Sequence, residues 1–116
     1  MSADPAAYLG AAEAARRIAR GELSAQALAQ ACLARASAHE ARLQAWTHLS
    51  PQAVMALAQA LDAQTTPKGL LHGVPVAVKD IIDTADMPSR YGSPIYAQHQ
   101  PVADAACVAQ CRAAGA

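Results

Sequence analysis

The sequence predicts an α/β fold in which a layer of helices precedes one apolar strand. Apolar residues recur every three or four positions in three segments before residue 64, which is typical of helices that bury one face. A β-branched run then covers residues 74–82 and opens with Gly73, as expected for a strand. We therefore expect residues 1–66 to form a helical layer and residues 67–116 to begin a core that contains a sheet.

Capping residues set the boundaries of the first two helices. Residues 11–20 carry small apolar side chains on one face, and Gly21 can end that helix in the left-handed conformation. Ser24 is a typical N-cap for a second helix over residues 25–40. The stripe of the second helix that we expect to face the core consists of Leu28, Cys32, Ala36 and His39.

A third helix is expected to begin at Ser50 and Pro51, because serine caps a helix and proline is tolerated in its first turn. Before it, Trp46 and Thr47 favour one short strand. Residues 64–69 are expected to form the loop that ends the helical layer. The expected buried face of the third helix consists of Val54, Leu57, Ala58 and Leu61.

The end of the chain is expected to be irregular and then helical. Residues 83–101 are rich in Pro, Gly and Ser, which favours an extended surface segment. Asp104 is the expected N-cap of a last helix, and Gly115 lies where a glycine commonly ends one.

Composition argues against several classes of protein. Nine basic and nine acidic residues give a formal net charge of zero, so nothing in the charge balance points to nucleic acid or an anionic membrane as a partner. No uninterrupted apolar stretch reaches the length of a membrane span. We therefore expect a cytoplasmic protein. Because aromatic residues make up only 3% and alanine supplies much of the apolar count, the core should be small.

Cysteine chemistry is a weak hypothesis for this chain. Cys32, Cys107 and Cys111 are odd in number and lack the spacing and histidine partners of a zinc site. We expect them to pack as small apolar residues. A thiol hydrolase that pairs Cys107 or Cys111 with His72 or His99 is weak for the same reason.

A metal site built on aspartates is also a weak hypothesis. Asp80, Asp83 and Asp86 recur every three residues, but the glycine and closing glutamate of a calcium loop are missing. We expect no metal and no cofactor, and we expect His72 to order the turn into the strand.

Lys79 is the strongest candidate for chemistry, because it lies inside the apolar strand. Desolvation disfavours an ammonium ion, so a buried lysine can become a general base. Taken alone, a single lysine in a strand is more often an edge or surface residue. Alternation places Ala77, Lys79 and Ile81 on one side and Asp80 on the other, so Asp80 is not an automatic ion-pair partner of Lys79.

The stretch GLLHGVPVAVKDIID, followed by MPSRYGSP and DAACVAQCRAAGA, resembles the amidase signature family, whose members are serine hydrolases that cleave carboxamides. The resemblance is strong from Gly69 to Ala116 and weak over residues 1–64. It implies that the chain supplies the N-terminal helices and the first strand of a mixed-sheet fold, which is incomplete. It also implies a catalytic triad of serine, a second serine held by a cis peptide, and lysine. Lys79 occupies the position of that lysine.

The resemblance also implies a mechanism for which this chain lacks two residues. The neutral lysine takes a proton through the bridging serine, the nucleophilic serine attacks the amide carbonyl, and water later releases the acid. No Gly/Ser-rich cluster occurs, and neither Ser89 nor Ser93 has glycines on both sides. We therefore expect an N-terminal part of an amidase, inactive alone, whose full-length relatives act on small-molecule amides.

Two alternatives stay open. The A subunit of a tRNA-dependent amidotransferase commonly has Lys-Asp-Asn at this motif, whereas Lys79, Asp80 and Ile81 favour a general amidase. A non-catalytic helical interaction module is the alternative from a different class. In either case an unpaired strand edge predicts self-association.

Overall fold

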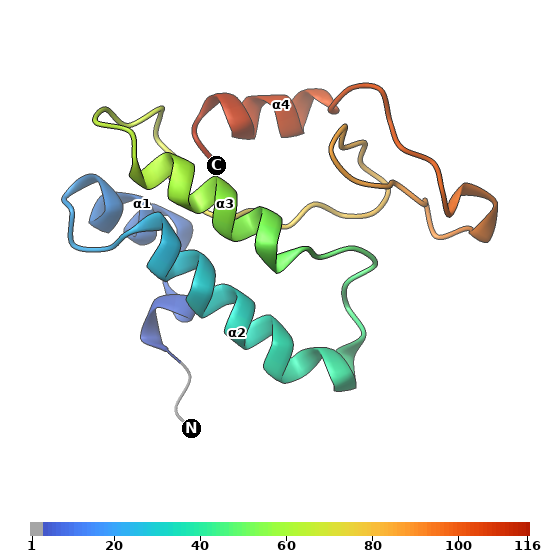
Figure 1. Ribbon diagram of the computed structural model, residues 1–116, viewed down its shortest axis with the longest axis horizontal. Helices are drawn as coiled ribbons and strands as arrows, with labels where there is room; N and C mark the ends of the chain where they lie inside the picture. Colours follow the sequence, from blue (N-terminus) through green and yellow to red (C-terminus); the bar gives the residue numbers. More distant parts are fainter. Residues whose placement is uncertain (1–3) are drawn as a thin grey trace.

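Helices make up all the regular secondary structure that the computed structural model contains between residues 4 and 116, the part of the chain that it describes (Figure 1). The molecule is elongated, with principal extents of 45 × 35 × 21 Å. In chain order the elements are the 3-10 helix η1 (Pro5–Tyr8), α1 (Ala11–Ala19), α2 (Ala25–Leu43), α3 (Pro51–Asp62), the 3-10 helix η2 (Pro94–Tyr96) and α4 (Ala106–Ala113).

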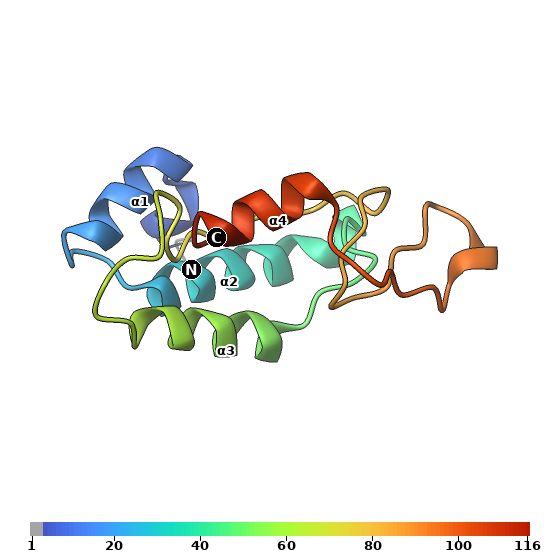
Figure 2. The same ribbon diagram turned by 90° about the horizontal axis from the view of Figure 1, so that it is seen from above.

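The first three α-helices form the layer that the sequence predicts. Helices α2 and α3 lie side by side in both views, and α1 packs beside the start of α2 (Figures 1 and 2). Ala25 and Ala29 of α2 and Ala58 of α3 form one buried cluster, in which small side chains let the two helices approach. A second cluster joins α1, α2 and the segment after residue 73 through Ala14, Leu28 and Val74.

The caps predicted at Gly21, Ser24 and Ser50 are confirmed. The Ser24 hydroxyl accepts the Ala27 N–H at 3.0 Å, and the Ser50 hydroxyl accepts the Ala53 N–H at 3.3 Å. Gly21 adopts φ +70° after α1, as a left-handed helix end requires. Helix α2 continues to Leu43, three residues beyond the predicted end, and its C-cap residue Gln44 takes a left-handed conformation.

The expected buried faces are partly right. On α2, Leu28 is buried and Cys32 and Ala36 are half-buried, but His39 is exposed. On α3, Ala58 is buried against α2, whereas Leu57 is 55% exposed and was wrongly assigned to the core. Leu57 is one position away from Ala58, so it points to a different side of the helix.

The predicted strands are not present among residues 4–116. Residues 74–79 are extended, but the N–H groups of residues 76–79 donate no hydrogen bond within this part of the chain. A β-ladder needs a neighbouring strand, and between residues 4 and 116 no segment pairs with residues 76–79. The short strand expected at Trp46 and Thr47 is likewise an irregular loop.

The last part of the chain folds back onto the turn that precedes the extended segment. The Leu71 N–H donates to the Ala114 carbonyl and the Gly73 N–H donates to the Gly115 carbonyl, each at 2.9 Å. Gly115 has φ +96° just after α4, as predicted for a terminating glycine. Asp104, however, does not cap α4: Ala105 is the N-cap residue, and the Asp104 carboxylate binds elsewhere.

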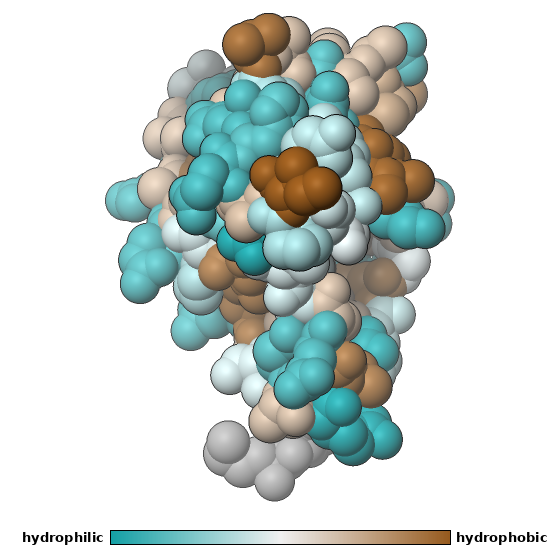
Figure 3. Space-filling view, turned by 90° about the vertical axis from the view of Figure 1, so that its right-hand side faces the viewer, coloured by the Kyte–Doolittle hydropathy of each residue, from teal (hydrophilic) through white to brown (hydrophobic). Residues whose placement is uncertain are grey.

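Residues 83–101 form the irregular surface segment that the sequence predicts. Figure 1 shows this segment projecting away from the helical layer, with η2 at its far end. Seen from that side, the molecule is mainly hydrophilic, with separate apolar spots (Figure 3). Ile95, which is 87% exposed, contributes an apolar side chain to the surface of this segment.

Candidate functional site

Lys79 lies at the end of the extended segment and at the start of a tight turn. Its carbonyl accepts the Ile82 N–H at 3.0 Å. Its side chain is exposed, which differs from the expected burial, and no strand lies over it within residues 4–116. Within the described chain no carboxylate lies within 4.0 Å of its amine, so Asp80 does not form an ion pair with it.

A cavity of about 30 Å³ lies beside Lys79. One water molecule needs about 10–15 Å³ of such volume, so the cavity has room for water beside the turn at Lys79. It forms where the loop before α3 meets the turn at Lys79 and the following loop. The lining residues are Thr47, His48, Val78, Lys79, Asp80, Ile82, Thr84, Met87, Pro88 and Ser89.

Asp80 connects the turn at Lys79 to a second turn ten residues later. Its Oδ1 atom accepts the Arg90 N–H at 2.8 Å, and its carbonyl accepts the Tyr91 N–H at 3.0 Å. Tyr91 adopts φ +53° and Gly92 φ +71°, so two consecutive residues are left-handed there. The Tyr91 hydroxyl donates to Asp83, and this hydrogen bond is the main cause of a raised Tyr91 pKa.

The two serines near Lys79 have structural roles. Ser89 is 1% exposed, its hydroxyl lies 3.5 Å from the Ile82 carbonyl, and its N–H donates to the His99 carbonyl at 3.0 Å. The Ser93 hydroxyl accepts the Ile95 N–H at 3.3 Å and thereby caps η2. Neither hydroxyl forms a hydrogen bond with the Lys79 amine within the described chain.

The aspartates of this region bind protein groups. Asp86 pairs with Arg112 of α4 at 2.9 Å, and Asp104 pairs with the same guanidinium at 2.8 Å. Asp104 also accepts the Ala85 N–H at 2.8 Å. Between residues 4 and 116 no group of three or more His, Cys, Asp or Glu side chains gathers in a way that could hold a metal ion.

The three cysteines are free. Cys107 is exposed, so the expectation that it packs as an apolar residue is wrong, whereas Cys32 and Cys111 are half-buried. Burial raises the pKa of the Cys32 thiol, which makes it a poor nucleophile. His99 lies near the rings of Tyr91 and Tyr96, with centroids 5.8 and 6.1 Å away.

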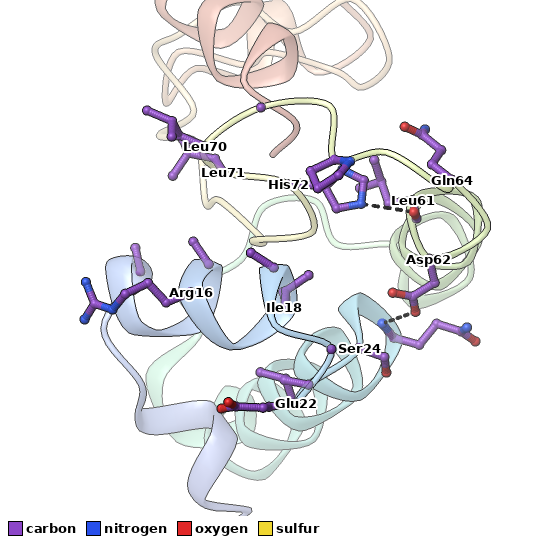
Figure 4. A pocket seen from close by; sticks show the side chains of 18 of the residues that line it. Arg16, Ile18, Glu22, Ser24, Leu61, Asp62, Gln64, Leu70, Leu71 and His72 are labelled. Carbon is purple, nitrogen blue, oxygen red and sulfur yellow. Dashed lines mark hydrogen bonds between the residues drawn. The ribbon is translucent and has the colours of Figure 1, made fainter.

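His72 orders the turn before the extended segment, as predicted. Its Nδ1 atom accepts the Lys68 N–H at 2.9 Å, and its Nε2 atom donates to the Leu61 carbonyl at 3.0 Å. It lies on the wall of an open groove of about 1410 Å³ between α1, the start of α2, the end of α3 and residues 64–72 (Figure 4). Lys79 does not line this groove.

Asp62 lies in the same groove and caps a neighbouring helix. Its two carboxylate oxygens accept the Ala25 and Gln26 N–H groups at 2.7 and 3.0 Å. Figure 4 shows one dashed line that leaves the Asp62 carboxylate. Burial raises the pKa of Asp62, but the hydrogen bonds from Gln26 and Ala25 together outweigh it and hold the pKa below its usual value. Asp62 therefore joins the end of α3 to the start of α2.

Comparison with known proteins decides the family. The family model described as "Amidase" matches residues 27–116. The chain belongs to the amidase family. Between residues 4 and 116 this amidase-family chain has no helix that is long and apolar enough to span a membrane.

Curated relatives of this amidase-family chain include components of amidotransferases as well as amidases. It is 46% identical over 101 residues to the A subunit of the glutamyl-tRNA(Gln) amidotransferase of Solidesulfovibrio magneticus, covering 86% of this chain and 21% of that protein. It is 33% identical over 119 residues to the putative amidase AmiD of Mycobacterium tuberculosis, covering 100% of this chain and 25% of that protein. The chain thus spans about a fifth to a quarter of the length of these relatives.

A solved structure shares the fold. The peptide amidase PAM, crystallised with the competitive inhibitor chymostatin, superimposes with a TM-score of 0.87 at 34% identity. The match covers 97% of this chain and 24% of the peptide amidase. The fold is therefore that of the matching part of an amidase.

Sequence reasoning missed two features of the surroundings of Lys79. Thr47 and His48 line the small cavity, although they lie about thirty residues earlier, and no local pattern connects them to Lys79. The turn at Tyr91 and Gly92 had a signal, because glycine is one of the strongest local signals of a turn. The acceptor that holds this turn, Asp80, could not be identified from spacing alone.

Proposed function

We propose that this chain supplies the general base, Lys79, of an amidase that hydrolyses carboxamide C–N bonds through an acyl-enzyme. The observation that carries the proposal is the Lys79 amine, which sits in the family's lysine motif with no carboxylate in ion-pair range. A carboxylate in ion-pair range would occupy the amine, and its absence between residues 4 and 116 leaves the amine able to contact a serine hydroxyl. In this proposal residues 1–66 form the helical layer and residues 67–116 begin the amidase core.

The proposed reaction uses Lys79 as a proton acceptor and donor. Neutral Lys79 Nζ accepts a proton from a bridging serine, which takes one from the nucleophilic serine as that serine bonds to the amide carbon. Protonated Lys79 then gives a proton, through the bridging serine, to the leaving amide nitrogen as the C–N bond breaks. Water then attacks the ester, and the acid leaves. We expect both serines to come from the part of an amidase that this chain does not match, so the 116 residues alone should not turn over.

A hybrid protein tests this proposal. In the hybrid, this chain replaces the part of the peptide amidase that it matches. We expect release of ammonia from a peptide amide, inhibited by chymostatin. General acid–base groups contribute about 10²–10⁴-fold, so Lys79→Ala should lower kcat by at least that factor. Lys68→Ala, the matched control at an exposed lysine, should leave kcat unchanged.

Retained turnover in the Lys79→Ala hybrid would remove Lys79 from the mechanism. Circular dichroism of each variant separates a loss of chemistry from a loss of folding. Turnover by the isolated 116-residue chain would contradict the expectation that the serines lie elsewhere.

The A subunit of an amidotransferase is the second candidate. It is favoured by identity, because two relatives with that name match at 46% and 43%, against 33% for the putative amidase AmiD. The sequence Lys79-Asp80-Ile81 favours the general amidase. A second hybrid decides between them: it is built on the A subunit of a glutamyl-tRNA(Gln) amidotransferase, and the amidation of glutamyl-tRNA(Gln) is measured. Inactivity of both folded hybrids would favour the non-catalytic interaction module.

Self-association and a cytoplasmic location stay predictions. The unpaired N–H groups of residues 76–79 are the surface that would carry self-association. A sedimentation series that shows a clean monomer over a wide concentration range would argue against it.

A further inference from the structure

We propose that Asp80 is a positioning residue that orients Lys79 through its hydrogen bonds to the turn at Arg90 and Tyr91. This inference rests on the proposed function of Lys79 and adds the group that holds it. Asp80 does not touch the Lys79 amine by an ion pair, so its effect is on geometry.

Asp80 is the first residue after the extended segment that is hydrogen-bonded to a distant turn of the described chain. The N–H groups of residues 76–79 donate no hydrogen bond within the described chain. At Lys79 and Asp80, by contrast, both carbonyls and one carboxylate oxygen accept backbone N–H groups, at 3.0, 3.0 and 2.8 Å. The direction of the Lys79 side chain therefore depends on the anchored residue that follows it.

The turn that Asp80 holds would not be stable by itself. Tyr91 adopts φ +53°, a region that L-residues with bulky side chains disfavour. Contacts must compensate for this conformation. Its N–H donates to the Asp80 carbonyl, its hydroxyl donates to Asp83, and its ring meets the edge of Tyr96 with centroids 5.2 Å apart.

The same segment is tied to a helix, so the anchor is rigid. The Asp83 carbonyl accepts the Ala105 N–H at 2.9 Å, next to the start of α4. Asp86 pairs with Arg112 of α4 at 2.9 Å. Through Asp80, Lys79 is thus held in a fixed position relative to α4. Because a charged acceptor forms a stronger hydrogen bond than a neutral one, the Asp80 carboxylate suits this role.

Loss of the Asp80 side chain should reduce catalysis through the position of the base. A displacement of about 1 Å can cost 10²-fold in rate without weakening substrate binding. We expect Asp80→Ala in the hybrid to lower kcat at least tenfold, with KM changed less than twofold. Asp80→Asn keeps an Oδ1 acceptor for the Arg90 N–H, so it should retain kcat within threefold. Glu22→Ala, which removes an exposed carboxylate of the helical layer that pairs only with Arg20, is the matched control and should leave kcat unchanged.

The 116-residue chain gives an independent readout by NMR. In Asp80→Ala the Arg90 amide should exchange with solvent at least tenfold faster, and the Lys79 resonances should shift. Asp80→Asn and the control Glu22→Ala should leave the Arg90 exchange rate unchanged. If Asp80→Ala lowers the folded population, Asp80→Glu replaces it, because the added methylene displaces the acceptor oxygen while keeping the charge.

The outcomes separate this inference from the proposed function. Full activity of the Lys79→Ala hybrid overturns the proposed function and this inference with it. An inactive Lys79→Ala hybrid beside a fully active Asp80→Ala hybrid overturns the inference alone, as does an Asp80→Asn hybrid that is as slow as Asp80→Ala. If no hybrid turns over, unchanged Arg90 exchange and Lys79 resonances in Asp80→Ala overturn the inference.

Discussion

The helical layer and the region after residue 67 satisfy their backbone hydrogen-bonding groups in different ways. Helices α1, α2 and α3 satisfy their backbone groups internally and bury small apolar side chains against one another. The later region relies on turns and on carboxylates that accept backbone N–H groups, and it leaves Leu70 90% exposed. The difference shows that a helix supplies its own backbone hydrogen bonds, whereas an extended segment needs neighbouring segments to supply them.

Lys79 lies in the region after residue 67, which has fewer backbone hydrogen bonds of its own than the helical layer. Its segment has unpaired backbone groups on one side and the anchored Asp80 on the other. Functional residues are often found on irregular segments held by a rigid scaffold. In this chain the scaffold includes α4, which fixes the loop after Asp80 through Arg112.

The largest effect is expected from the core of the helical layer. Leu28 is buried between α1 and Val74, so Leu28→Ala should lower the free energy of unfolding by roughly 2–5 kcal/mol. Leu57→Ala, the matched change at an exposed position of α3, should cost less than about 0.5 kcal/mol. Urea unfolding measures both. Equal losses would show that the helical layer is not the folded core.

The contact between the two regions is tested by a pair of glycines. Gly115 has φ +96°, and a Cβ there would lie 2.8 Å from the His72 Cα atom. Gly92 has φ +71°, but its Cβ would meet nothing within 4 Å. Gly92→Ala should cost about 1 kcal/mol from backbone strain alone. Gly115→Ala should cost about 1–3 kcal/mol more, because the clash is with backbone. Similar costs in urea unfolding would mean that the chain end does not pack on His72.

Asp62 gives a smaller and pH-dependent effect within the helical layer. Its pKa is lowered in the folded state, so its contribution to stability is present above pH about 4 and is lost as pH falls through the lowered pKa. Asp62→Asn should cost about 1 kcal/mol near neutral pH, as expected for a lost cap. Its unfolding free energy should also fall less steeply than that of the unsubstituted chain as the pH is lowered from about 5 to about 2. Parallel pH profiles would contradict the role of the carboxylate.

The smallest effect is expected at Tyr91 in the later region. The hydrogen bond to Asp83 raises its pKa, so its contribution to stability is present below pH about 10 and is lost as pH rises through the raised pKa. Ultraviolet titration of the three tyrosines should show one that ionises late. Tyr91→Phe should remove that late step and leave the helical content unchanged. A late step that persists in Tyr91→Phe would assign it to another tyrosine.

How much the sequence predicts follows the same division. Ser24, Ser50 and Gly21 act within one turn of their own helix, so local rules placed them correctly. The strand over residues 74–82 was wrong for this chain because pairing depends on a partner elsewhere. Aspartate commonly caps helices, but the carboxylate of Asp104 instead binds the Ala85 N–H and Arg112.

For the candidate site, the sequence alone points to Lys79, and the role of Lys79 stays a prediction. The motif around Lys79 identified the lysine from local sequence. The groups around it come from two separate places: His48 before α3, and the later loop, where Ser89 is followed by the Arg90 N–H that binds Asp80. Contacts between residues this far apart leave no periodic pattern in the sequence, so only the fold brings them together.

Amide hydrogen exchange over the 116-residue chain tests the central claim most directly, namely that the segment carrying Lys79 lacks the backbone partners that the helices supply to themselves. We expect the amides of α2 and α3 to exchange at least about a hundredfold more slowly than those of residues 76–79, because only the helical amides must open to exchange. Protection of residues 76–79 equal to that of α2 would contradict the account, since it would require a backbone partner that the structure does not contain.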